Sequence, residues 1–265
     1  MTSDGPAAQF TDIVFTTDGN VAEIVLDRPE KGNTLRPETI DEIDAAREYA
    51  EDTDGINALV IRSTGDRFFS TGADLNSVLP LIEEDDSDGV SEFNANWHAA
   101  YRRIEQSAIP IIAGVSGMAL AGGFELLLVC DLVVAAPSAR FGDHHVKYNL
   151  IGGGGSTQRL PRLVGLRRAK ELLLTEKMIS AETAREWGLV NEVIGEDDDL
   201  AEATMALAKD VASHHPLALR RQKHLANQSV EMALEPSLKL EQEMANVHLL
   251  SSAAQEGLAE FMDRE

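Results

Sequence analysis

Residues 117–125 read GMALAGGFE and continue into an apolar run, LLLV, at 126–129. The glycine pair at 122–123 permits a tight turn in which a backbone N–H points at a ligand, and the apolar run predicts a helix that begins at this turn. The earlier stretch FSTGADL, residues 69–75, holds a second glycine turn. Two N–H groups that converge on one oxygen form an oxyanion hole, and a helix N-terminus adds positive partial charge there.

A third segment, TQRL at 157–160 followed by Gly165, comes after these two. Taken in this order, the three segments resemble the enoyl-CoA hydratase/isomerase (crotonase) superfamily, and the resemblance spans about residues 10–260. It implies an α/β fold, a crotonase-like spiral of ββα turns, in which a core at 8–195 carries the CoA site and the active site. It also implies a C-terminal helical oligomerisation region at 196–265 that packs subunits into homotrimers, often paired as homohexamers. The chain shows no strict internal repeat, so the spiral is an implication of the resemblance alone.

The resemblance also assigns roles to residues of this chain. The N–H groups of Ala73 and Gly122 are the expected oxyanion-hole donors for a CoA thioester carbonyl, and Glu125 is the expected general acid or base. The residues expected to contact the CoA thioester substrate are Arg28, Lys31, Asn33, Gly72, Asp74, Leu75, Asn76 and Gly123. Many members of the superfamily carry Lys at the position of Asn76, which here offers no positive charge to a phosphate.

The neighbours of Glu125 predict burial of its carboxylate. Phe124 and the apolar run at 126–129 flank it, so the helix is expected to be covered on most sides. An unpaired buried carboxylate is costly, which favours a catalytic role for Glu125. The alternative is a helix residue that faces solvent.

The chain departs from the superfamily pattern at His145. Hydratases of the superfamily carry a second Glu at this position, and their two carboxylates hold one water between them. An imidazole titrates near neutrality, so His145 could act as a second catalytic group or could only line the pocket. Asp143 and His144 are candidates to orient it. Superfamily hydrolases of β-diketones pair a histidine near here with an Asp nine residues later, and that later position is Gly154 in this chain.

The resemblance and these residues together imply an enoyl-CoA hydratase, which adds water reversibly across the 2,3 double bond of an acyl-CoA thioester. Glu125 would move a proton between water and substrate, and His145 would assist or orient the water. Three other functions stay open: Δ3,Δ2-enoyl-CoA isomerisation by Glu125 alone, C–C or thioester hydrolysis that uses His145, and CoA-ester binding with little catalysis. No cofactor is implied beyond the CoA of the substrate, and no metal-ligand spacing such as HExxH occurs.

The remaining pattern predicts alternating strands and helices followed by a helical tail. A hairpin is expected at 13–26 and a helix at about 37–51. Residues 82–96 are rich in charge and poor in apolar side chains, so they predict a mobile loop or a poorly packed insert, followed by a helix at 97–105. The last third of the chain is nearly all helical in pattern, with Ser180 as one N-cap.

The chain of 265 residues is strongly acidic: 45 Asp and Glu face 23 Lys and Arg, for a formal net charge of −22. This charge argues against binding to a nucleic-acid backbone. It is typical of an acidic enzyme or, as we expect, of a halophilic protein whose surface carboxylates stay hydrated in concentrated salt. No apolar stretch of about 18 residues predicts a membrane span, the N-terminus has no leader pattern, and the single Cys130 fits a reducing cytoplasm.

Overall fold

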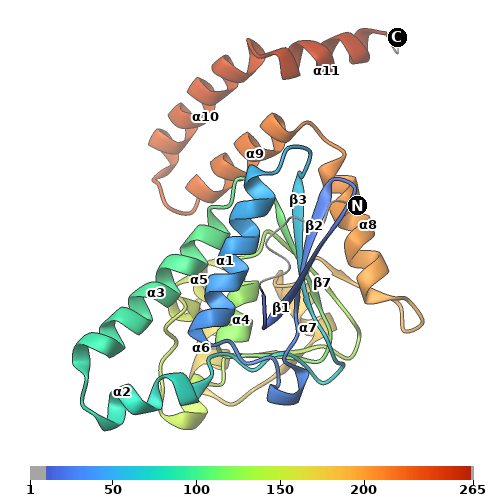
Figure 1. Ribbon diagram of the computed structural model, residues 1–265. Coiled ribbons are helices and arrows are strands. Elements are labelled where there is room, and N and C mark those ends of the chain that lie inside the picture. Colours follow the sequence, from blue (N-terminus) through green and yellow to red (C-terminus); the bar gives the residue numbers. More distant parts are fainter. Residues whose placement is uncertain (1–9, 264–265) are drawn as a thin grey trace.

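The computed structural model of the chain describes residues 10–263 (Figure 1). The predicted start of the core at residue 8, most of the N-terminal segment expected to carry no leader, and residues 264–265 of the helical tail lie outside the described residues. Within the described range, no helix combines the length and the apolar character needed to cross a membrane.

Two sheets form the centre of the described part of the chain. Their strand orders are β1-β2-β3-β5-β7-β10 and β4-β6-β8-β9. Neighbouring strands are parallel, except for the antiparallel pairs β1–β2 and β8–β9. The strands of the larger sheet are β1 (Ile13–Asp18), β2 (Val21–Leu26), β3 (Ala58–Ser63), β5 (Ile111–Val115), β7 (Leu132–Ala135) and β10 (Glu192–Val193). Those of the smaller sheet are β4 (Phe68–Ser70), β6 (Met118–Leu120), β8 (Arg140–Gly142) and β9 (Ile179–Ser180).

From β3 to β8, consecutive strands alternate between the two sheets. β3 precedes β4, β5 precedes β6, β7 precedes β8, and a helical segment follows each pair. The chain therefore rises through successive ββα turns, which confirms the α/β spiral expected from the resemblance. β3 (ALVIRS) and β5 (IIAGV) are almost continuously apolar and buried, because both faces of the larger sheet are covered.

The helix predicted at about 37–51 and the predicted Ser180 cap are both present. α1 covers Pro37–Asp52, and Ser180 caps α7 by accepting the Thr183 N–H at 3.2 Å. The other helices are α2 (Leu79–Glu83), α3 (Ser87–Glu105), α4 (Gly122–Leu127), α5 (Ser156–Val164), α6 (Leu166–Leu174), α7 (Ala181–Trp187), α8 (Leu200–Ala212), α9 (Pro216–Gln228), α10 (Leu234–Leu249) and α11 (Ser252–Met262). The short strands β9 and β10 interrupt the predicted helical tail because they pair with β8 and β7, and local patterns do not contain such long-range pairing.

The prediction of a mobile loop at residues 82–96 is wrong, although no side chain in this range is buried, as expected for a poorly packed insert. Helix α3 already begins at residue 87, and the side chain of Asp86 caps it by accepting a backbone N–H three residues further on at 2.9 Å. Phe93 and Trp97, one turn apart, have ring centroids 5.6 Å apart. One cap and one aromatic stripe hold the helix although much of its surface is polar.

The helical region predicted for 196–265 divides into parts with different surroundings. α8 packs on β3 and β5 of the larger sheet, where Ala208 and Ala212 join a second apolar cluster. α9 is tied to the core because the Lys223 ammonium binds the Asp131 carboxylate at 2.6 Å. α10 and α11, red in Figure 1, extend away from the body of the molecule.

Candidate active site

The two glycine turns singled out in the sequence meet at backbone distance. Gly72 follows β4 with a φ of +90°, and Gly122 opens α4 after β6. β4 and β6 are parallel neighbours, so their carboxyl ends lie side by side. A Cβ on Gly72 would lie 2.6 Å from the Gly122 nitrogen, and one on Gly122 would lie 3.3 Å from the Ala73 nitrogen. Both positions therefore suit glycine, because a side chain would push the turns apart.

The N–H groups of Ala73 and Gly122 have no backbone acceptor in the part of the chain that the structure describes. Beside Ala73, the Leu35 N–H donates to the Gly72 carbonyl at 2.9 Å, and the Asp74 N–H donates to the Leu35 carbonyl at 2.8 Å. This parallel bridge uses the groups on either side of Ala73, so the N–H of Ala73 itself faces away from Leu35. The N–H of Gly122 belongs to the first turn of α4, which has no partner inside the helix. Two donors therefore lie side by side.

Two residues hold the Gly122 backbone in place. Ala121 has φ of +48° and ψ of −123°, a conformation that costs a residue with a side chain about 1–3 kcal/mol. Tyr101 is fully buried, and its hydroxyl donates to the Gly122 carbonyl at 2.7 Å. Burial and the nearby charge of Glu125 raise the pKa of Tyr101, so its hydroxyl keeps its proton. Backbone strain and a buried hydrogen bond thus both act on the residues that present the Gly122 N–H.

Glu125 lies one turn further along α4 and is 1% exposed, which matches the burial expected from its neighbours. Both oxygens of its carboxylate accept the Gly154 N–H at 3.0 Å, and Oε1 also accepts the Ser156 N–H at 3.0 Å. Backbone donors therefore satisfy this buried charge. The carboxylate belongs to the same short helix as the Gly122 donor.

The loop that reaches Glu125 depends on glycine and on Arg159. A Cβ on Gly152 would lie 2.7 Å from Oε1 of Glu125, and one on Gly154 would lie 2.5 Å from Oε2, so the backbone approaches the carboxylate only without side chains. Arg159 donates to the Gly154 carbonyl at 2.8 Å, and it binds both carboxylate oxygens of Glu105 at 2.7 and 2.8 Å. A bidentate ion pair with α3 therefore holds the loop in place.

His145 approaches Glu125 from the segment after β8. Its Nε2 lies 3.9 Å from Oε2 of Glu125, and its Nδ1 lies 3.1 Å from Oδ1 of Asp143, in a close ionic contact rather than an aligned hydrogen bond. Asp143 is 2% exposed. Burial by itself lowers the pKa of His145, but the carboxylates of Asp143 and Glu125 outweigh burial and raise the pKa above its usual value. The ring therefore holds its proton more readily than a free imidazole does.

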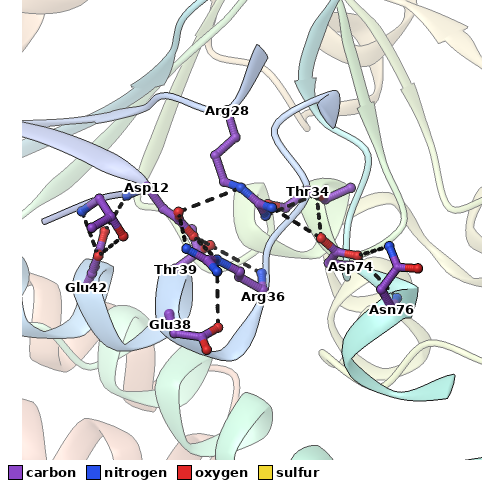
Figure 2. A network of polar contacts seen from close by, with 10 residues as sticks. Asp12, Arg28, Thr34, Arg36, Glu38, Thr39, Glu42, Asp74 and Asn76 are labelled. Atoms are coloured by element: carbon purple, nitrogen blue, oxygen red, sulfur yellow. Dashed lines mark hydrogen bonds and ion pairs between the residues drawn. The ribbon is translucent and has the colours of Figure 1, made fainter. Parts of the chain in front are cut away.

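Two of the residues expected to contact CoA have side chains that bind other groups of the protein. Arg28 is 15% exposed and binds Thr34 and Asp74 (Figure 2). Asn33 is buried, and its side-chain amide donates at 3.0 Å to two carbonyls at the ends of the β3–β4 connection. These side chains support the loops that carry them, and their expected contact with CoA stays a prediction.

The other expected substrate contacts divide into exposed and packed residues. Lys31 and Asn76 are exposed, and the side chain of Leu75 is half exposed. Gly123 is buried, and a Cβ there would collide with the Ser70 carbonyl, so this glycine permits close packing of α4 on β4.

Two residues that support the site, Tyr101 and Arg159, were not expected from the sequence to do so. Tyr101 follows Phe93 and Trp97 at four-residue spacing, and this aromatic stripe is the signal that points to a buried helix face. Arg159 belongs to the TQRL segment, where its charge beside apolar residues indicates a paired side chain. Asp143 is one of the two candidates named to orient His145, and the contact at 3.1 Å involves Asp143.

Comparisons with known proteins show which family the chain resembles. The profile of the enoyl-CoA hydratase/isomerase family matches residues 16–265. A crotonyl-CoA hydratase from Syntrophomonas wolfei is 32% identical over 255 residues, which cover 96% of this chain and 96% of that protein. A crystal structure of enoyl-CoA hydratase from Bacillus anthracis is similar with a TM-score of 0.89 and 31% identity, covering 96% of this chain and 97% of that one. An enoyl-CoA hydratase subunit I from Geobacillus kaustophilus gives a TM-score of 0.89 and 35% identity, covering 97% of both chains.

The chain belongs to the enoyl-CoA hydratase/isomerase family.

Proposed function

We propose that this chain is an enoyl-CoA hydratase that adds water reversibly across the 2,3 double bond of an acyl-CoA thioester. The observation that carries the proposal is the pair of N–H groups of Ala73 and Gly122 beside the buried carboxylate of Glu125. Such a pair of donors suits a thioester oxygen, which gains negative charge as the enolate forms. The hydratase names of the similar proteins support the same reaction.

In the proposed reaction, Glu125 takes a proton from a water molecule while the water oxygen bonds to C3. The electrons of the double bond move toward the thioester, and the N–H groups of Ala73 and Gly122 donate to the enolate oxygen, each contributing about 2.7–4 kcal/mol. The enolate collapses as the imidazolium of His145 gives a proton to C2. A proton then returns from Glu125 to His145 through one bridging water molecule, because Nε2 and Oε2 are 3.9 Å apart, and both groups regain their starting state.

The surroundings of the two groups suit these opposite roles. Glu125 accepts N–H groups of the glycine loop, which suits a carboxylate that acts as the base. His145 lies between Asp143 and Glu125, which suits an imidazolium that acts as the acid. The proposal therefore uses one carboxylate and one imidazole where hydratases of the superfamily use two carboxylates.

The CoA part of the substrate is proposed to lie along the loop at 28–33 and the turn at 72–76. Lys31 is the exposed cation of the first loop, and Leu75 and Asn76 offer exposed side chains in the second. The proposed steps use no redox cofactor and no metal ion.

Crotonyl-CoA provides the test. Hydration removes the enoyl absorbance without release of free thiol. Glu125→Gln should lower kcat by about 10²–10⁴-fold, and it should leave the Kd for crotonyl-CoA nearly unchanged because the amide oxygen still accepts the N–H of Gly154. An unchanged rate in this variant would remove Glu125 from the mechanism.

The Asp143–His145 contact favours a second candidate, a hydrolase in which His145 activates water against the thioester carbonyl. Release of free CoA thiol with loss of the acyl group identifies this activity in the same assay. His145→Gln abolishes it, and hydration without thiol release contradicts it.

We also propose that the region from α9 to α11 forms the subunit interface of a homotrimer or homohexamer. Large apolar side chains on α10 and α11 are exposed in the single chain, including Leu249, Leu258, Phe261 and Met262. Apolar surface of this kind is commonly covered by a partner. Light scattering after size-exclusion chromatography measures the mass, and a monomer would refute this assignment.

A further inference from the structure

Arg28 begins the first of the two loops proposed to hold CoA, and groups of the protein surround its guanidinium (Figure 2). Nη1 donates to the Thr34 carbonyl at 2.9 Å and to the Thr34 hydroxyl at 3.2 Å, and Nη2 donates to Oδ2 of Asp74 at 3.3 Å. Nε lies 3.7 Å from Oδ1 of Asp12. Because only 15% of the side chain is exposed, Arg28 has little surface left for a phosphate.

The Asp12 end of this network is tied to α1. Arg36 donates from Nε and Nη2 to the two carboxylate oxygens of Asp12 at 2.6 and 2.7 Å, and the hydroxyl of Thr39 donates to the same carboxylate. Burial alone raises the pKa of Asp12, but the hydrogen bonds of Arg36 and Thr39 outweigh it and lower the pKa. Arg28 therefore faces a charged and fixed carboxylate at the start of β1.

The other end of the network reaches the proposed oxyanion donor. Asp74 directly follows Ala73, and Oδ1 of Asp74 accepts the N–H and the side-chain amide of Asn76 at 3.2 and 2.9 Å. Burial alone raises the pKa of Asp74, but the hydrogen bonds of Asn76 and Arg28 outweigh it, so this side chain stays charged. The N–H of Asp74 is bound to the Leu35 carbonyl as well. Hydrogen bonds thus hold both the backbone N–H and the side chain of Asp74, the residue next to the donor.

We infer that Arg28 is a positioning residue for the oxyanion hole, and that it sets the direction of the Ala73 N–H through Asp74 and Thr34. The inference rests on the proposed function, which gives this N–H an enolate oxygen to face. An oxyanion donor works at about 2.7–3.1 Å from the charged oxygen. A small rotation of the peptide between Gly72 and Ala73 therefore weakens the transition state more than it weakens substrate binding.

Steady-state kinetics with crotonyl-CoA separate this role from a contact with CoA. Arg28→Met should lower kcat by about 10-fold or more and leave KM within about threefold of the wild-type value. Arg28→Lys keeps the positive charge but lacks the planar guanidinium group, so its kcat should lie between those of Arg28→Met and the wild type. Arg62→Met is the matched control, because Arg62 forms a comparable, partly buried ion pair with Glu23 at 2.6 Å on the larger sheet. This control should leave kcat unchanged.

A second measurement uses butyryl-CoA, which has no 2,3 double bond to hydrate. The vibrational spectrum of the bound ligand should show a thioester C=O stretching frequency that is lowered by the two N–H donors. Arg28→Met should reverse part of this shift, whereas Arg62→Met should preserve it. The melting temperature of each variant shows whether the fold is retained.

Two results for Arg28→Met overturn the inference. A raised KM with an unchanged kcat would show that Arg28 contacts CoA. A lowered melting temperature with an unchanged kcat and carbonyl frequency would show that Arg28 has a purely structural role. Failure of the proposed function gives a different pattern: the wild type shifts the carbonyl of butyryl-CoA but does not hydrate crotonyl-CoA. In that case the frequency shift in Arg28→Met still decides the positioning role.

Discussion

Nδ1 of His145 lies 3.1 Å from Oδ1 of Asp143, while Nε2 of the same ring faces Oε2 of Glu125 at 3.9 Å. A single-turn helix at His145–Tyr148 begins here, and His144 before it has a left-handed φ of +56°. This turn brings the imidazole back over Asp143. The imidazole therefore lies between two carboxylates.

Asp143→Asn should move the alkaline limb of the pH–rate profile to lower pH. The negative charges of Asp143 and Glu125 raise the pKa of His145 against the effect of burial, and removal of one charge lowers it. Because the imidazolium is the proposed acid, kcat falls as the pH rises through this pKa. Profiles recorded between about pH 5 and 9 cover this titration. His144→Gln is the neighbouring control, and an unmoved limb in Asp143→Asn would contradict the assignment.

The raised pKa of His145 also predicts how folding stability depends on pH. A group whose pKa rises on folding stabilises the native state fully below its unfolded pKa, about 6.5 for histidine. This contribution is lost as the pH rises through the higher pKa of the folded state. Urea unfolding at about pH 6 and pH 8 measures it. The difference between the two values should shrink in His145→Gln, and an equal difference in both proteins would count against the prediction.

Gly72→Ala should inactivate the enzyme at the level of kcat. The new Cβ would lie 2.6 Å from the Gly122 nitrogen and would push apart two donors, each contributing about 2.7–4 kcal/mol. We expect a fall in kcat of at least about 10²-fold. Gly55→Ala is the matched control, because Gly55 has nearly the same φ, +89°, and a Cβ there would meet no atom within 4 Å. Both variants carry the same backbone strain, so equal activities would refute the explanation.

Lys223→Met should destabilise the fold by about 3 kcal/mol. Its ammonium binds Oδ2 of Asp131 at 2.6 Å and the Ile109 carbonyl at 3.0 Å, and its loss leaves a largely buried carboxylate without its cation. The free energy of unfolding in urea measures the effect. Lys209→Met is the control, since the Lys209–Asp18 pair is exposed and contributes at most about 1 kcal/mol. Equal losses in the two variants would show that burial is not the cause.

Removal of salt should lower the melting temperature, as expected for a halophilic protein. The net charge of −22 includes the consecutive acidic residues at 83–86, most of which are exposed. Like charges repel over about 10 Å at 0.1 M salt but over only about 3 Å at 1 M. Thermal unfolding across this range measures the effect, with sucrose as a control for general exclusion effects. A melting temperature that is constant down to low ionic strength would refute halophilic adaptation.

Local patterns were sufficient for most of the elements. The hairpin at 13–26, helix α1 and the Ser180 cap follow from turn residues, apolar periodicity and capping chemistry. Helix α3 was missed over residues 87–96, because charge-rich composition obscured its cap and its aromatic stripe. The strands β9 and β10 were missed because each consists of two residues held by pairing with a distant strand.

The candidate site was predictable in part. The sequence marks Gly72, Gly122 and Glu125, and the structure brings their segments together, although their roles in the reaction stay predictions. The internal partners of the Arg28 and Asn33 side chains were not predicted, and the expected CoA contacts of these residues stay predictions. Those partners lie in other segments of the chain, so local sequence patterns do not predict the contacts.

The amino-acid order was enough to locate the flexible glycine turns and a carboxylate with apolar neighbours, because conformational freedom and burial depend on residue type and on near neighbours. The orientation of the imidazole against Asp143, the approach of a glycine loop to Glu125 and the attachment of Arg28 to Asp74 arose only when remote segments packed together. These contacts depend on differences of a few tenths of an ångström between atoms far apart in the chain, and only the folded arrangement of the two sheets sets such distances.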